Sequence, residues 1–260
     1  MKKTITSIFI ALVLFSCGNN KYEKKILGKW FELKETSKLE FKKDSLTVSD
    51  YVVRKCKWNA DGKKILFVFE KEFNDSLKKQ TIKYRLKNDT LIIVDNGELE
   101  FNEFKLIKAN NFTEFILKKN SISLNLEENE DSEFIDVENK NGIKIFVEFK
   151  NEKIECKSEY SESLENLDND INKLLLDLSP YIINELENIR TENDTDESSI
   201  NRWLKVNSYY SLFIDKKVPE SKINSIIEKL RKTKIKRIYR IYKTEDNEFV
   251  DFNKLKGIKL

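Results

Sequence analysis

Histidine is absent from this 260-residue sequence, which removes the side chain most often used as a general base and as a metal ligand. The only cysteines, Cys17, Cys56 and Cys156, lie too far apart for the close spacing of a structural zinc site. Glycine is also scarce, and the six glycines are too scattered to build a phosphate-binding loop. We therefore expect a protein that is not an enzyme and that holds no metal ion and no cofactor.

The sequence also lacks an apolar run long enough to cross a membrane. A membrane-spanning helix needs about 20 apolar residues, whereas the apolar run Ile8–Phe15 has eight. Lys2 and Lys3 precede this run, and a short apolar segment behind a positive start is typical of a secretory signal peptide. Residues 1–16 are therefore predicted to be a signal peptide that takes no part in the fold.

The segment Leu14-Phe15-Ser16-Cys17 resembles the lipobox of bacterial lipoproteins. That family acylates the cysteine, so the resemblance implies a lipid anchor on Cys17 and a lipidated N-terminus and linker over residues 17–25. Gly18 follows and no acidic cluster comes next, which favours an anchor that faces the periplasm. The expected location is the cell envelope, on a bacterial membrane. The alternative is an ordinary signal peptide with a chance cysteine.

Neither sign of charge predominates, because 48 Lys and Arg residues stand against 45 Asp and Glu residues. This balance gives no reason to expect nucleic acid as a partner. Aromatic and aliphatic residues are plentiful, so the chain should fold, and its length allows two domains. Cys56 and Cys156 could pair in an oxidising compartment, or remain two separate small buried residues.

Residues 26–119 show the alternation that marks half-buried strands. Ile65, Phe67 and Phe69 share one strand face, for example, and turn residues such as Asp61-Gly62 separate the short strands. No helical period interrupts the alternation. The pattern predicts an antiparallel β-meander that forms a barrel or a sandwich.

The stretch "ILGKW", residues 26–30, resembles the start of small bacterial lipocalin-like domains. In that family a Gly-x-Trp opens the first strand and the tryptophan plugs one end of the barrel, which assigns these roles to Gly28 and Trp30. The family also places an arginine of the last strand over the tryptophan, where residues 101–117 offer only Lys105 and Lys108. The resemblance implies a barrel whose mouth holds a small hydrophobic ligand. The alternative is a barrel filled by its own side chains.

Residues 120–260 alternate between strand and helix patterns. Strands are expected at 121–126, 134–137, 142–149, 204–215 and 235–242. A helix from Ser163 should end at Ser179-Pro180, where a second helix starts, and Pro219 should open a third with Ile223, Ile226, Ile227 and Leu230 as its buried stripe. The fold class expected for the chain is α+β, an N-terminal antiparallel β-meander followed by a C-terminal α/β two-layer domain.

Residues 211–243 resemble the periplasmic domain of the ExbD/TolR biopolymer-transport family. The shared pattern is a strand that ends in Asp215, a basic turn, a helix behind Pro219 and a basic strand. Residues 122–137 are similar to the family's first strand, and "GIKIFVEFKNEKIE" to the hairpin that follows it. The resemblance implies an α+β domain over 120–260 that tends to pair, and a place beside envelope transport machinery. The family's proton-relaying membrane helix has no counterpart after the signal peptide, so that role is not carried over.

The basic strand 235–242 supplies the candidate interaction residues. Lys236, Arg240 and Tyr242 share one face of a strand that could be a sheet edge. Lysines on an edge commonly serve only to prevent aggregation. Alternatively, this edge docks an acidic partner, or the acidic run 127–133 of a second copy, by strand addition.

These features together favour a non-catalytic, lipid-anchored envelope protein whose C-terminal domain mediates protein or cell-wall interaction. Its expected partners are the membrane, through the anchor, and a second copy or another envelope protein. The alternative function is the binding or carrying of a small hydrophobic ligand in the lipocalin-like domain.

Overall fold

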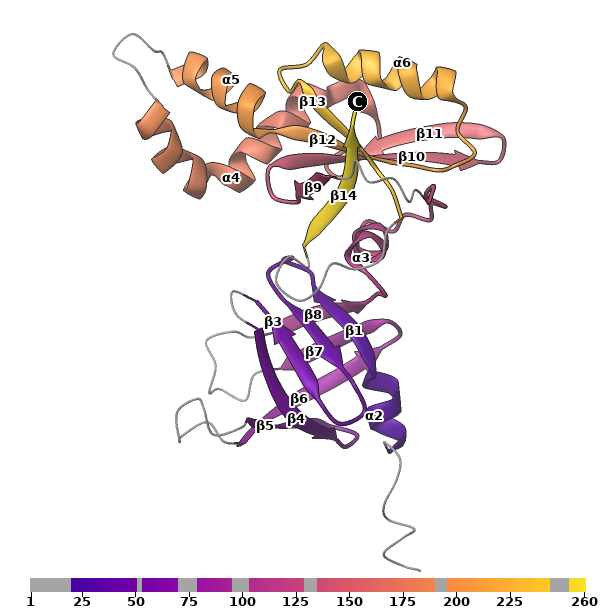
Figure 1. Cartoon of the computed structure of the whole chain (residues 1–260), viewed down its shortest axis with the longest axis vertical. Coiled ribbons are helices and arrows are strands. Elements are labelled where there is room, and N and C mark those ends of the chain that lie inside the picture. The colour runs from indigo at the N-terminus through magenta and orange to yellow at the C-terminus, as the bar shows by residue number, and fades with distance from the viewer. Residues whose placement is uncertain are drawn as a thin grey trace, which may run out of the picture. The chain divides into compact units, whose positions relative to one another are not determined.

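The computed structural model of the chain describes residues 20–50, 53–69, 79–94, 103–128, 135–189, 196–243 and 253–260. The contacts divide the chain into two compact units, Met1–Asn110 and Asn111–Leu260. The first unit holds a closed antiparallel barrel and the second a six-stranded mixed sheet with helices (Figure 1). Within the described ranges, every helix is too short or too polar to cross a membrane.

Eight strands close the barrel in chain order, and the last strand pairs back with the first. They are β1 (Gly28–Glu32), β2 (Lys38–Phe41), β3 (Leu46–Ser49), β4 (Val53–Ala60), β5 (Lys64–Phe69), β6 (Lys79–Lys87), β7 (Thr90–Val94) and β8 (Glu103–Lys108). In β4, for example, Cys56, Trp58 and Ala60 are buried and the residues between them are exposed. The barrel predicted from the period-2 alternation is therefore confirmed.

A short helix, α2 (Lys21–Ile26), precedes the barrel in a segment expected to be a linker. The Asn20 side chain accepts hydrogen bonds from the N–H groups of Tyr22 and Glu23, and the Glu23 side chain accepts one from the N–H of Asn20. This is a capping box, and its Asn-x-x-Glu spacing was the sequence signal for the helix.

The second unit is built on one sheet with the strand order β11-β10-β12-β13-β14-β9. The strands are β9 (Ile135–Glu138), β10 (Gly142–Lys150), β11 (Lys153–Ser158), β12 (Tyr209–Ile214), β13 (Arg237–Ile241) and β14 (Lys254–Lys259). β10, β12 and β13 run parallel, and the outer strands pair antiparallel. The parallel centre follows from the connections, because helical segments lie between these three strands.

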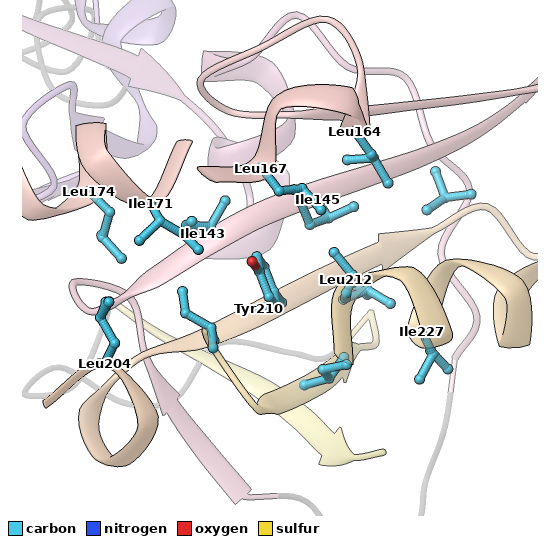
Figure 2. Close-up of a cluster of buried hydrophobic side chains, with 14 of the residues drawn as sticks. Ile143, Ile145, Leu164, Leu167, Ile171, Leu174, Leu204, Tyr210, Leu212 and Ile227 are labelled. Atoms are coloured by element: carbon cyan, nitrogen blue, oxygen red, sulfur yellow. The ribbon is translucent and has the colours of Figure 1, made fainter. Parts of the chain in front are cut away.

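Three helices cover one face of this sheet: α4 (Leu167–Ile189), α5 (Asp196–Asn207) and α6 (Glu220–Arg231). Figure 2 shows how their side chains meet those of the strands, with Tyr210 and Leu212 of β12 among Ile145, Leu167 and Ile227. The short helix η2 (Leu164–Asn166) adds Leu164 to the same core. The buried stripe predicted for α6 is confirmed at Ile223, Ile227 and Leu230.

The other face of the central strands is buried as well. All six residues of β12 are buried, and Phe146 of β10 lies against Phe213 of β12 with ring centroids 5.3 Å apart. A strand buried on both faces reads as a continuous apolar run, as Tyr209–Ile214 does. The two-layer arrangement expected for this domain is not confirmed.

Several helical segments differ from the prediction. Residues 112–119 form α3 (Phe112–Lys119), capped by Asn111, where alternation predicted a strand. α4 continues through Pro180, because its apolar spacing carries on from Leu178 to Ile182 in the same phase. Residues 204–207 belong to α5, so the strand expected over 204–215 is shorter. Residues 121–126 form an isolated bridge at Leu126 in place of a strand.

Candidate ligand-binding site

Trp30 lies in the core of the barrel, beside helix α2. This side chain is fully buried, and its indole Nε1 donates a hydrogen bond to the carbonyl of Ile26 at 2.6 Å. Helix α2 brings Ile26 to this position, and the Asn20 side chain fastens the helix to β4 by donating to the carbonyl of Ala60 at 2.8 Å. The plugging role that the resemblance assigned to Trp30 is consistent with this geometry.

Lys108 lies beside Trp30, and Gly28 lies beside the Lys108 stem. Lys108 pairs with Trp30 across β8 and β1, and its ammonium lies 5.3 Å from the centre of the Trp30 ring. Gly28 has a φ of +114°, and a Cβ built there would come within 3.0 Å of the Lys108 Cε. Glycine is favoured here by its backbone conformation, whereas the lysine stem is flexible and could shift by a few tenths of an ångström. Lys108 lies over the tryptophan, in the place where the lipocalin pattern has an arginine.

The barrel contains a cavity of about 440 Å³. Eight of its lining residues are apolar. They face the cavity because every second side chain of a barrel strand points inward. They are Leu39, Leu46, Val48, Phe67, Phe69, Ile82, Ile93 and Phe104. This volume lies within the range of about 300–1,000 Å³ that is usual for small-molecule sites.

Six polar residues, here called the rim, also line the cavity: Glu32, Thr36, Ser37, Asp50, Arg54 and Gln80. They lie where β1 and β3 end and where β2, β4 and β6 begin, which in an antiparallel barrel is one and the same end. Arg54 donates a hydrogen bond to Asp50, and the hydroxyls of Thr36 and Ser37 donate to Glu32. The cavity is therefore an apolar chamber with a hydrogen-bonded polar rim.

The barrel interior holds one cysteine, Cys56, which is a free thiol like Cys156 in the second unit. Burial raises the pKa of the Cys56 thiol to about 11, so it stays protonated and weakly nucleophilic at neutral pH. No group of three or more acidic, cysteine or histidine side chains that could hold a metal ion occurs in the described part of the chain.

The candidate interaction residues Lys236, Arg240 and Tyr242, which lie in or beside β13, occupy a different environment from the one predicted. β13 lies between β12 and β14, so the expectation of an edge strand is wrong, and strand addition at this strand is not possible. The edge prediction failed because β14 was not recognised as a strand from the sequence. In Lys254–Lys259, buried Leu255 and Gly257 alternate with lysines.

The charged candidate residues Lys236 and Arg240 are engaged within the chain. Arg240 contacts Glu127 at 2.9 Å and Glu220 at 3.6 Å, and its guanidinium lies 5.4 Å from the ring centre of Tyr242. Lys236 donates to the carbonyl of Arg231 at 2.8 Å. Glu127, at the start of the acidic run 127–133, thus contacts Arg240 of the same molecule, whereas the sequence suggested that a second copy could supply this run.

The rim residues were not singled out from the sequence. The signal was nevertheless present, since Glu32 follows Trp30 at a spacing of two and must share its face of β1. Cys17, the predicted lipidation site, and the signal peptide lie outside the described residues. No protein-family model, curated protein or solved structure matches this chain, so its function is inferred from the geometry of the barrel.

Proposed function

We propose that the first unit binds a small hydrophobic ligand in its barrel. The observation that carries this proposal is the cavity of about 440 Å³ with eight apolar lining residues. A barrel filled by its own side chains would leave no such space. The likeness of the Gly28-x-Trp30 start to lipocalin-like domains supports the same function, as does the burial of Trp30 in the barrel core.

Binding of a neutral, environment-sensitive dye such as Nile red to the whole chain tests this proposal. We expect saturable binding with a blue shift, and we expect Val48→Trp to weaken it at least about tenfold, because the larger side chain fills the cavity. Leu86→Trp is the matched control, since Leu86 packs in the barrel core but does not line the cavity. Both variants need their melting temperatures measured. A folded wild-type protein that binds no dye, or a folded Val48→Trp that binds it normally, would refute the proposal.

The lipid anchor expected at Cys17 would hold this binding unit at a bacterial membrane, facing the periplasm. For the second unit we propose a role in engaging an envelope partner or a second copy. Its β12–α6–β13 arrangement, with Pro219 directly before α6, matches the order of elements on which the ExbD/TolR likeness rests. A stable dimer or hetero-complex in native mass spectrometry of detergent-extracted protein would support this role, and a purely monomeric protein would count against it.

A further inference from the structure

Glu32 is a carboxylate placed inside an apolar chamber. It ends β1 on the same inward face as Trp30, lines the cavity, and is only 6% exposed. Burial of a charged group without partners costs several kcal/mol. The hydrogen-bond partners of this carboxylate therefore indicate which chemical group of a ligand could bind in the cavity.

Among the described residues, hydrogen-bond donors reach only one of the two carboxylate oxygens. Oε2 accepts hydrogen bonds from the hydroxyls of Thr36 and Ser37, the second at 3.1 Å. Oε1 accepts none from the residues that the structure describes. An ionised carboxylate can accept about four hydrogen bonds, so Glu32 retains capacity for a donor that comes from the cavity.

The remaining charges on the described lining do not favour an anion. Asp50 and Arg54 are the other two charged lining residues, and they are paired with each other. The formal charges of Glu32, Asp50 and Arg54 sum to −1. Because Asp50 and Arg54 offset each other, the net negative charge lies on Glu32, which is less exposed than either of them. An anionic head group would meet this charge and would have to take Arg54 away from Asp50.

We infer that the ligand of the barrel is an apolar molecule with a cationic, hydrogen-bond-donating group, such as an alkylamine, whose nitrogen binds Glu32. This inference rests on the proposed function and adds the chemical class of the ligand. The apolar part fills the chamber between Phe67, Phe104 and Ile93, and the ammonium binds Oε1 of Glu32. A charge-assisted hydrogen bond of this kind is stronger than a neutral one.

Three ligands with one chain and different heads test the inference: decylamine, decanol and decanoate. Each displaces Nile red from the whole chain at pH 7.5, where an alkylamine is charged because its pKa is near that of lysine, about 10.4. We expect decylamine to bind about tenfold or more tightly than decanol, from the difference between charged and neutral hydrogen bonds, and decanoate to bind most weakly. Equal affinities, or tightest binding of decanoate, would overturn the inference.

The variant Glu32→Gln tests whether the preference for decylamine over decanol depends on the Glu32 carboxylate. Glutamine is close to isosteric, and its amide oxygen can still accept from Thr36 and Ser37, so the barrel should fold, and the affinity for decanol is measured in the same variant as the reference. We expect the preference for decylamine over decanol to fall to within about threefold. The matched control is Glu40→Gln, which removes the same charge from a β2 residue that does not line the cavity and should keep the preference.

The outcomes separate this inference from the proposed function. If neither Nile red nor any decyl compound binds the folded wild-type chain, the proposed function fails and the inference fails with it. If Nile red and decanol bind but the amine has no advantage, only the inference fails. If the amine preference survives Glu32→Gln in a variant with an unchanged melting temperature, Glu32 is not the residue that recognises the head group, and the inference is overturned.

Discussion

At the scale of single residues, the barrel shows a lysine in a position where the lipocalin pattern has an arginine. The Lys108 stem passes over Gly28, and its ammonium faces the Trp30 ring and lies 3.4 Å from the carbonyl oxygen of Lys25. A lysine has fewer donors than an arginine, but a cation over a tryptophan face is stabilising for either side chain. The arrangement of Gly28, Trp30 and Lys108 therefore combines a long cationic side chain over the Trp30 ring with a glycine next to the stem of that side chain.

Lys108→Met should lower the free energy of unfolding of the barrel by about 1 kcal/mol, since it removes the cation from the Trp30 ring and keeps the aliphatic stem. Lys108→Arg should retain most of the stability. The measurement is urea unfolding followed by tryptophan fluorescence. Lys105→Met is the control, because Lys105 lies on the same strand three residues before Lys108, is half exposed and contacts Glu103 instead of Trp30. A loss for Lys105→Met as large as that for Lys108→Met would contradict this account.

The residues of the binding site were only partly predictable. Alternation along the strands identified inward positions such as Phe67 and Phe69, and the Gly-x-Trp start identified Trp30. Glu32 and Arg54 were missed because 36% of the residues are charged, so one inward-facing charge does not stand out in the sequence. The cavity itself depends on the sum of many side-chain volumes, which no short pattern reports.

At the scale of elements, strands with regular alternation were predicted well and segments with mixed signals were not. α6 was recognised because Pro219, a basic C-terminus and an i, i+3, i+4 stripe all agree. α4 was divided at Pro180 because the proline outweighed the continuing apolar phase. β14 was missed because lysines and a glycine in Lys254–Lys259 weaken its strand signal. That omission made β13 look like an edge.

The pairing of β10 with β12 makes a test at this scale possible. Gly142 lies opposite Tyr209 in the parallel register, and a Cβ built on Gly142 would come within 2.1 Å of the tyrosine ring. Gly142→Ala should therefore destabilise the second unit by about 1–3 kcal/mol through overpacking, as followed by thermal unfolding. Combined with Tyr209→Leu, the alanine should cost much less, because the ring that it meets is gone. Simple additivity of the two losses would argue against a steric cause.

At the scale of the whole molecule, the organisation into two folded units follows from the sequence, because the hydrophobic period changes along the chain. Each unit has its own buried core, one inside the barrel and one between the sheet and its helices. The signal-like start and the cysteine behind it are the basis of our proposal that the protein is delivered to a membrane surface. A ligand-binding barrel held there would meet apolar molecules that leave or enter the bilayer.

The attachment to the membrane is the last prediction. Wild-type protein should enter the detergent phase of a Triton X-114 extraction and stay with membranes after a carbonate wash, since two or three acyl chains contribute roughly 0.8 kcal/mol for each buried methylene. Cys17→Ser should give an uncleaved or soluble form that enters the aqueous phase, because the eight-residue apolar run Ile8–Phe15 is too short to span the bilayer. Cys56→Ser, which changes a buried cysteine of the barrel, should partition like the wild type. If Cys17→Ser remained in the membrane pellet after carbonate, the anchor would have to come from another part of the protein, and lipidation at Cys17 would be wrong.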